Sequence, residues 1–217
     1  APNVSLFRFL GEYGFKFKNK KILELGFFHG ADLLEFKKRE SKVYGIDINQ
    51  SAVKNLKKKI NKKNILQVDL AKNEIPFKTK FDLIFSRDFI YYLNKEEMKF
   101  HFDNVSKSLK NNGLYLFQFI EKDIIYPKNK KHKYNFDSVF SNNSFAEKDN
   151  PVKFYTTKFF VNSLKKRFNL VGEKFLIESY GIREKKIRLN KYLLCKKKWK
   201  FRLNQKLNHL TQLTKLN

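Results

Sequence analysis

The stretch Lys21–Gly30, with the sequence KILELGFFHG, constrains the fold more than any other part of the chain. An apolar run ends in two glycines, Gly26 and Gly30, and a helix-like segment over 31–39 follows. This order predicts a buried strand, a tight turn and the start of a helix. Such a turn lets backbone N–H groups and the helix dipole approach a ligand closely, and Glu24 near the strand end can hold a cationic or hydroxyl group of that ligand.

Further acids stand at matching places downstream. Asp47 and Asp69 each end a short apolar segment, and Asp88 follows the apolar segment 81–86 after one intervening residue, Arg87. In an open α/β sheet, ligands bind outside the carboxyl ends of the strands. We therefore expect these acids to converge on one crevice.

Four motifs in this order resemble the class I S-adenosylmethionine-dependent methyltransferases. They are ELGxxxG from Glu24, GID ending at Asp47, VD ending at Asp69 and FDLIFSRD ending at Asp88. The resemblance covers roughly residues 20–196. The family's first motif is an acid followed by GxGxG, and Phe28 stands here at the central glycine position. A nicotinamide dinucleotide is the competing ligand, but its GxGxxG fingerprint also needs a glycine at 28.

The resemblance implies S-adenosylmethionine as cofactor and S-adenosylhomocysteine as product. Glu24 would lie under the methionine portion, and Asp47 would accept hydrogen bonds from both ribose hydroxyls. Ile48 would pack on adenine, Asp69 would accept from the adenine amino group, and Leu70 would present its backbone N–H. The alternatives to cofactor binding are that Asp47 caps a helix and that Asp69 caps a loop. The predicted cofactor site comprises Glu24, Gly26, Phe28, Gly30, Asp47, Ile48, Asp69, Leu70 and Ser86.

Phe28 departs from the family pattern at a crowded position. Either the loop is wider there, or the side chain points away from the cofactor. The departure also motivates one alternative function, a methyltransferase-like scaffold without activity.

The family places catalytic and acceptor-binding groups directly after the strand 81–86. Methyl transfer from a sulfonium is an in-line displacement, so alignment of the acceptor supplies much of the rate, and a hydroxyl acceptor also needs its proton removed. We expect catalytic roles for Asp88, Tyr92 and His132. Acceptor-binding roles are predicted for Arg87, Tyr91, Tyr126 and Tyr134. The alternatives are core packing of Tyr91 and Tyr92 and a local ion pair between Arg87 and Asp88; His101 is assigned to core or surface.

The expected fold is α/β: a Rossmann-like, seven-stranded, mostly parallel sheet with helices on both faces and an antiparallel C-terminal hairpin. Strands are predicted at 21–25, 42–47, 64–69, 81–86, 114–120, 170–178 and 187–196. Helices are predicted within 3–14 and at 31–39, 50–61, 95–110 and 156–168. Asn94 caps the fourth helix, and Asn111-Asn112-Gly113 ends it. A methyltransferase domain would span 1–196, with a substrate lid at 123–155, and a basic amphipathic tail would occupy 197–217.

Composition limits the other classes of function. The formal net charge is +26, but lysines outnumber arginines 40 to 7 and are spread along the chain, which favours a solvated surface over a nucleic-acid face. A single cysteine, Cys195, excludes a disulfide framework, and the histidines lack metal-site spacing, so no metal is expected. The sequence has no membrane-length apolar run and no signal peptide, so a cytoplasmic location is expected.

The leading functional hypothesis is methylation of an oxygen or nitrogen of a small molecule, such as a sugar or a biosynthetic intermediate. Lysines and aromatics within 123–155 suggest an acceptor that carries a negative charge. An RNA-directed methyltransferase that uses the lysine-rich surface is the second hypothesis.

Overall fold

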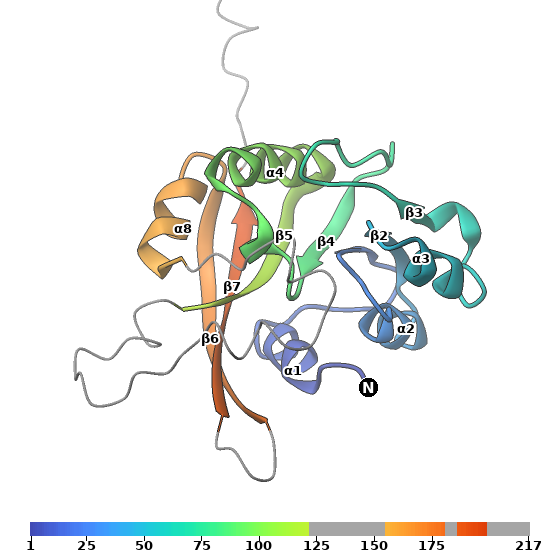
Figure 1. Ribbon diagram of the computed structural model, residues 1–217, viewed down its shortest axis with the longest axis horizontal. Coiled ribbons are helices and arrows are strands. Elements are labelled where there is room, and N and C mark those ends of the chain that lie inside the picture. Colours follow the sequence, from blue (N-terminus) through green and yellow to red (C-terminus); the bar gives the residue numbers. More distant parts are fainter. Residues whose placement is uncertain (122–154, 181–185, 199–217) are drawn as a thin grey trace, which may run out of the picture.

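The computed structural model describes residues 1–121, 155–180 and 186–198 (Figure 1). Seven strands form one sheet in the order β3-β2-β1-β4-β5-β7-β6. The strands are β1 (Lys21–Leu25), β2 (Lys42–Asp47), β3 (Ile65–Gln67), β4 (Phe81–Ser86), β5 (Leu109–Ile120), β6 (Phe168–Tyr180) and β7 (Lys186–Lys197). The helices are α1 (Val4–Glu12), α2 (Ala31–Lys38), α3 (Gln50–Leu56), α4 (Lys95–Ser108) and α8 (Thr157–Leu164), with short 3-10 turns η1 (Lys62–Asn64) and η2 (Ile90–Tyr92).

The pairing confirms the predicted fold class. Strands β3, β2, β1, β4 and β5 pair in parallel, whereas β7 runs antiparallel to both β5 and β6. The chain leaves β1 towards β2 and β3 and then crosses back to β4 on the other side of β1. The order therefore reverses between β1 and β4, and this switch point is where open α/β sheets bind their ligands.

Helices cover both faces of the sheet (Figure 1). Apolar side chains of α1, α2 and α3 pack on one face, among them Phe7, Leu33 and Leu56. Side chains of α4 and α8 pack on the other, including Phe102 and Phe160. The central strands β1 and β4 and the second half of β5 are thus buried on two sides, as their near-continuous apolar runs require.

The prediction that residues 111–113 end the fourth helix was wrong. Helix α4 ends at Ser108, and β5 begins at Leu109, which pairs with Phe81; the register then shifts so that Leu83 pairs with Leu114. Asn112 has a φ of 61°, and a Cβ on Gly113 would lie 3.0 Å from two backbone carbonyl oxygens. The Asn-Gly pair therefore forms an irregularity inside a strand, because a left-handed residue suits a bulge as well as a helix end.

Three other predicted elements are shorter than expected. Helix α3 stops at Leu56, β3 covers only three residues, and α8 ends at Leu164. Ile60, which falls within the predicted helix 50–61, is buried although it follows α3.

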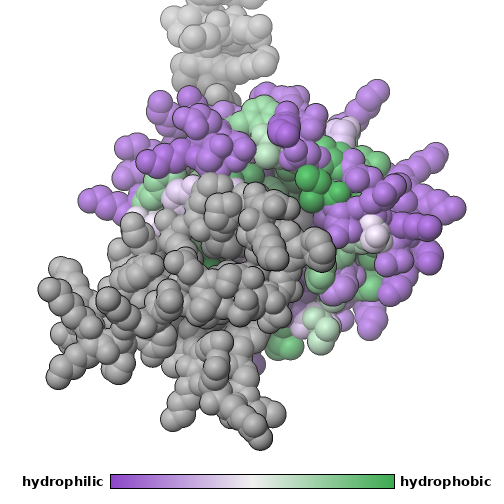
Figure 2. Space-filling model, viewed as in Figure 1, coloured by the Kyte–Doolittle hydropathy of each residue, from purple (hydrophilic) through white to green (hydrophobic). Residues whose placement is uncertain are grey.

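Two predicted segments lie outside the described residues, namely most of the lid at 123–155 and most of the tail at 197–217. The proposed division of the chain into domain, lid and tail stays a prediction. No helix within the described part is long and apolar enough to cross a membrane. In Figure 2, hydrophilic side chains cover most of the described surface around α4 and around α2 and α3.

Helix α4 begins with the predicted cap. The Asn94 side chain accepts a hydrogen bond from Glu97 N at 2.9 Å, and Glu97 Oε2 accepts one from Asn94 N at 2.7 Å, which completes a capping box. We expect Asn94→Ala to lower the free energy of unfolding by about 1 kcal/mol. The substitution removes the acceptor of Glu97 N, and it disturbs the position of the N–H of residue 94 that donates to Glu97. Urea denaturation measures this, and Asn94→Ser, which keeps a capping oxygen, should lose less. Equal losses in both variants would contradict a capping role.

Candidate functional site

The glycine turn between β1 and α2 has three residues in the left-handed region. The φ angles of Gly26, Phe28 and Gly30 are 72°, 46° and 65°. The Phe28 side chain is 61% exposed, so it points away from the turn, which is the second of the two arrangements expected for this residue. A Cβ on Gly30 would lie 2.6 Å from Leu56, so glycine there allows the turn to pack against α3.

Asp47 joins this turn to the end of β2. Its Oδ2 accepts a hydrogen bond from Phe28 N at 2.7 Å, and its Oδ1 accepts one from Asn49 N at 2.8 Å. Asn49, rather than Asp47, is the N-cap of α3. The carboxylate is therefore positioned by two backbone donors at the carboxyl end of β2.

Glu24 is buried at the foot of the turn. Its Oε2 has no hydrogen-bond partner among the described residues. Burial, reinforced by the negative charge of Asp32, raises the pKa of Glu24 well above its ordinary value. A buried carboxyl oxygen without a partner can accept a donor from a ligand, so this residue fits a cationic or hydroxyl-bearing group at the switch point.

The third predicted acid, Asp69, caps its own loop. Its Oδ1 accepts a hydrogen bond from Ala71 N at 3.0 Å, and Lys72 Nζ lies 3.6 Å from its Oδ2. The side chain of Leu70 is buried in the core, whereas Ile48 is 64% exposed beside Asp47. Ile48 is thus available to cover a ligand that lies on the end of β2.

Arg87 forms a buried ion pair that the sequence did not predict. Its Nε donates to Asp32 Oδ2 at 2.6 Å, and Asp32 Oδ1 accepts from Asn3 N at 2.7 Å. The alternative of a local ion pair between Arg87 and Asp88 is not found, because the first turn of α2 presents Asp32 to the guanidinium. The signal in the sequence was an acid in the first turn of a predicted helix, where the macrodipole favours it.

Asp88 is held by two side-chain donors. Its φ is 49°, and its Oδ1 accepts from Tyr91 OH at 2.8 Å and from Gln118 Nε2 at 3.3 Å. Gln118 is buried in β5, and its Oε1 has no partner in the described part of the chain. Gln118 was missed, although a lone amide in the apolar run of β5 was a visible signal.

The two tyrosines after β4 differ in their surroundings. Tyr91 is buried and bonded to Asp88, so it serves both packing and the polar cluster, whereas Tyr92 is half-buried with its ring 4.8 Å from that of Tyr91. The ring of Phe89 lies against Gly26, at 3.3 Å from where a Cβ would stand. Phe89 therefore brings the segment after β4 into contact with the glycine turn.

Three predicted site residues, Tyr126, His132 and Tyr134, lie outside the described residues. No group of three potential metal ligands occurs among the residues described. Among the described residues, the candidate site therefore comprises the glycine turn, Asp47 at the end of β2, Asp69 after β3, and the cluster of Asp88 with Tyr91 and Gln118, called the Asp88 cluster below.

Comparison with known proteins identifies this arrangement. A family model described as "Methyltransferase domain" matches residues 22–113, which include all four sequence motifs. Residues 22–113 therefore match a methyltransferase domain, which agrees with the resemblance of the four motifs to the class I S-adenosylmethionine-dependent methyltransferases. A search of curated protein sequences found no match.

Solved structures share the fold of this chain at low sequence identity. TehB from Haemophilus influenzae has a TM-score of 0.63 at 15% identity over 91% of this chain, which spans only 63% of TehB. Magnesium protoporphyrin IX methyltransferase from Synechocystis, solved with bound S-adenosylhomocysteine, has a TM-score of 0.62 at 15% identity, with 89% of this chain and 81% of that chain covered. A methyltransferase from Methanosarcina mazei has a TM-score of 0.62 at 16% identity, with 84% and 94% covered.

A row of buried, hydrogen-bonded polar side chains lies beneath the candidate site. Ser86 Oγ is 3.4 Å from Tyr115 OH, which is 2.9 Å from His101 Nε2. The His101 ring also contacts Phe89, with 5.3 Å between ring centroids. His101 therefore lies in the core, which is one of the two expected placements, and links α4 to the end of β4.

His101 should make stability depend on pH. Burial lowers its pKa to about 3, whereas an unfolded histidine titrates near its ordinary value of about 6.5. The neutral ring contributes its full stability above pH 6.5, and this is lost as the pH falls towards 3 because the unfolded state binds the extra proton. Between pH 7 and pH 5 we expect a loss of about 2 kcal/mol.

Urea denaturation at the two pH values tests this expectation. His101→Phe provides the comparison, because it keeps a ring of similar size and cannot titrate. The pH-dependent loss should be much smaller in this variant. The same loss in both proteins would show that other groups cause it.

Proposed function

We propose that this methyltransferase transfers a methyl group to an oxygen or nitrogen of a small molecule. The Asp88 cluster carries the proposal. This cluster follows β4, and Ser86, the last residue of β4, pairs with Leu25 just before the glycine turn. The polar groups of the cluster therefore lie next to the proposed cofactor site at the carboxyl end of the sheet. By its name, one structural neighbour acts on magnesium protoporphyrin IX, a small molecule, and this supports a small acceptor.

The residues of the switch point fit S-adenosylmethionine. Glu24 offers a buried acceptor without a partner among the described residues, and the left-handed residues Gly26, Phe28 and Gly30 form the tight turn next to it. Asp47 and Ile48 would hold the adenosine, and Asp69 and Leu70 would border its base. When bound, the cofactor supplies a sulfonium methyl group for in-line displacement.

Asp88 would bind and orient the acceptor. Its carboxylate can accept the proton of a hydroxyl or hold an amine N–H, and Tyr91 and Gln118 fix its orientation. A residue other than glycine in the left-handed region costs free energy, and such strain is often found where side-chain direction matters for function. Arg87 is occupied by Asp32, so we assign it to positioning rather than to the acceptor.

The first test concerns cofactor binding. We expect Asp47→Ala to weaken S-adenosylhomocysteine binding at least 10-fold, because hydrogen bonds to a charged acceptor contribute about 1.5–3 kcal/mol. Isothermal titration calorimetry measures the affinity, and Glu40→Ala, which removes an exposed acid paired with Lys18, is the control. Unchanged affinity in Asp47→Ala would exclude Asp47 from the cofactor site.

The second test concerns the acceptor. Labelled S-adenosylmethionine is incubated with the protein and a fractionated cell extract, and the label is followed by mass and by sensitivity to nuclease. We expect the label in a low-mass, nuclease-resistant product. Label in nuclease-sensitive material would instead show an RNA-directed enzyme, and cofactor binding without transfer would show an inactive scaffold.

Asp88→Asn should lower turnover about 100-fold or more if the acceptor is a hydroxyl, because general base catalysis contributes at least that factor. Cofactor affinity should stay unchanged. The control is Glu96→Gln, which neutralises an exposed acid in the first turn of α4. Full turnover in Asp88→Asn would remove Asp88 from the reaction.

A further inference from the structure

A second cavity lies at the opposite end of the sheet from the proposed active site. It is bordered by Lys20 just before β1, by Asp82 near the start of β4, by the irregular start of β5 and by Lys196 near the end of β7. Its volume is about 380 Å³. Parallel strands begin at this edge, so the cavity is separate from the carboxyl-end crevice.

Four lysines from separate segments line this cavity. They are Lys16, Lys20, Lys110 and Lys196, and Asp82 is the one acid among the described lining residues. Four positive charges and one negative charge give the lining a net formal charge of +3. Because a concave surface focuses the field of its charges, this cavity should attract anions more strongly than scattered lysines do.

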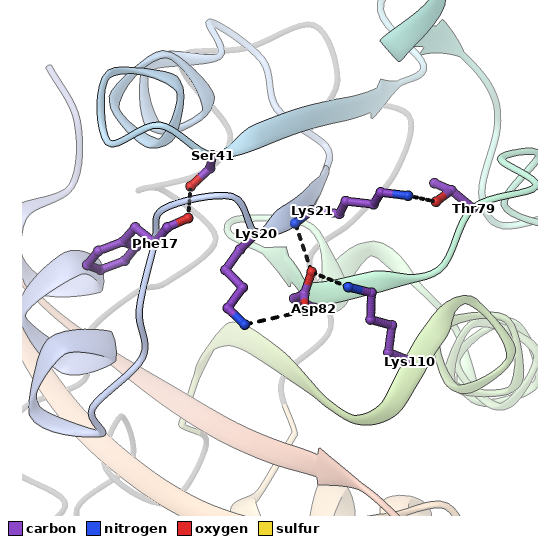
Figure 3. Close-up of polar contacts among 7 residues, drawn as sticks. All are labelled: Phe17, Lys20, Lys21, Ser41, Thr79, Asp82 and Lys110. Carbon is purple, nitrogen blue, oxygen red and sulfur yellow. Dashed lines mark hydrogen bonds and ion pairs between the residues drawn. The ribbon is translucent and has the colours of Figure 1, made fainter.

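Asp82 orients two of the lysines (Figure 3). Its Oδ2 accepts from Lys110 Nζ at 2.8 Å and from Lys21 N at 2.9 Å, and Lys20 Nζ lies 3.8 Å from its Oδ1. Burial by itself would raise the pKa of Asp82, but the bonds from Lys110 and Lys21 N lower it, so the carboxylate stays charged. Its negative charge is thus already shared by Lys20 and Lys110.

The positive charges of the other two lysines, Lys16 and Lys196, are not balanced in this way. Within the described part of the chain, Lys16 and Lys196 form no ion pair with an acid. Lysine is a common ligand of phosphate groups, which it binds as a point charge. Asn111 and Asn112 add amide donors, and the half-exposed ring of Tyr13 forms part of the lining.

We propose that this cavity binds a small anion that carries at least two phosphate groups, of the pyrophosphate or nucleoside polyphosphate class. The volume falls within the range of small-molecule sites. Such an anion would relieve the repulsion among the four lysines, and it would do so away from the methyl-transfer site. The site therefore has a ligand of its own.

Calorimetric titration with pyrophosphate at about 0.15 M salt tests the proposal, because exposed charges are largely screened at this ionic strength. We expect saturable binding of one anion per chain. The variant Lys16→Ala/Lys196→Ala should bind at least 10-fold more weakly. These two lysines are chosen because their loss leaves the Asp82 contacts intact.

The control variant is Lys99→Ala/Lys158→Ala, which removes two exposed lysines from α4 and α8. Its pyrophosphate affinity should stay within twofold of the unmodified protein. Equal weakening in both double variants would mean attraction by the overall positive charge and would overturn the proposal, as would the absence of saturable binding. S-adenosylhomocysteine affinity, measured in parallel, should be unchanged in both variants.

A single-stranded RNA decamer distinguishes a free phosphate ligand from a nucleic-acid backbone. Under the proposal, the decamer binds no more tightly than pyrophosphate, and its binding does not depend on Lys16 and Lys196. Binding at least 10-fold tighter than that of pyrophosphate, and lost in Lys16→Ala/Lys196→Ala, would assign the cavity to nucleic acid and overturn the small-ligand proposal.

Discussion

The hydrogen bond from Phe28 N to Asp47 is the contact on which the candidate site depends. It holds the glycine turn, with its left-handed residues, against the end of β2. The same carboxylate also receives Asn49 N and so fixes the entry into α3. Backbone in the left-handed region persists only where its surroundings stabilise it, and Asp47 provides this stabilisation from a neighbouring strand. The turn and the acid are therefore one structural unit.

Buried charges at the switch point are compensated across long sequence distances. Arg87 from the end of β4 pairs with Asp32 on α2, and Asp32 also receives the backbone N–H of Asn3 ahead of α1. A buried charge without a partner would be costly, so three distant segments must meet for this region to form. The N-terminal helix is thereby attached to the site rather than merely packed beside it. Burial, reinforced by the negative charge of Asp32, raises the pKa of Glu24 next to this pair.

Phe28 shows how a motif can depart from its family pattern without losing the geometry. Only a few per cent of residues other than glycine have positive φ angles, yet Phe28 has a φ of 46° with an exposed side chain. The glycine preference at this position reflects crowding by a Cβ. Here the Cβ and ring point outward, so the backbone N–H remains free to bind Asp47. The strain is local, and the turn keeps its path.

The sequence by itself determined the positions of the strands, the glycine turn and the acids near the ends of β1, β2 and β4, because apolar runs, glycines and the residues that follow them are local properties. It also assigned His101 to the core or the surface, and the tertiary structure decided for the core. It did not determine that Arg87 pairs with Asp32, that Gln118 reaches Asp88, or that the Asn112–Gly113 signal forms a bulge rather than a helix end. Four dispersed lysines likewise gave no sign that they line one cavity. These features depend on which strands are neighbours and in what register, and only the tertiary structure decides that.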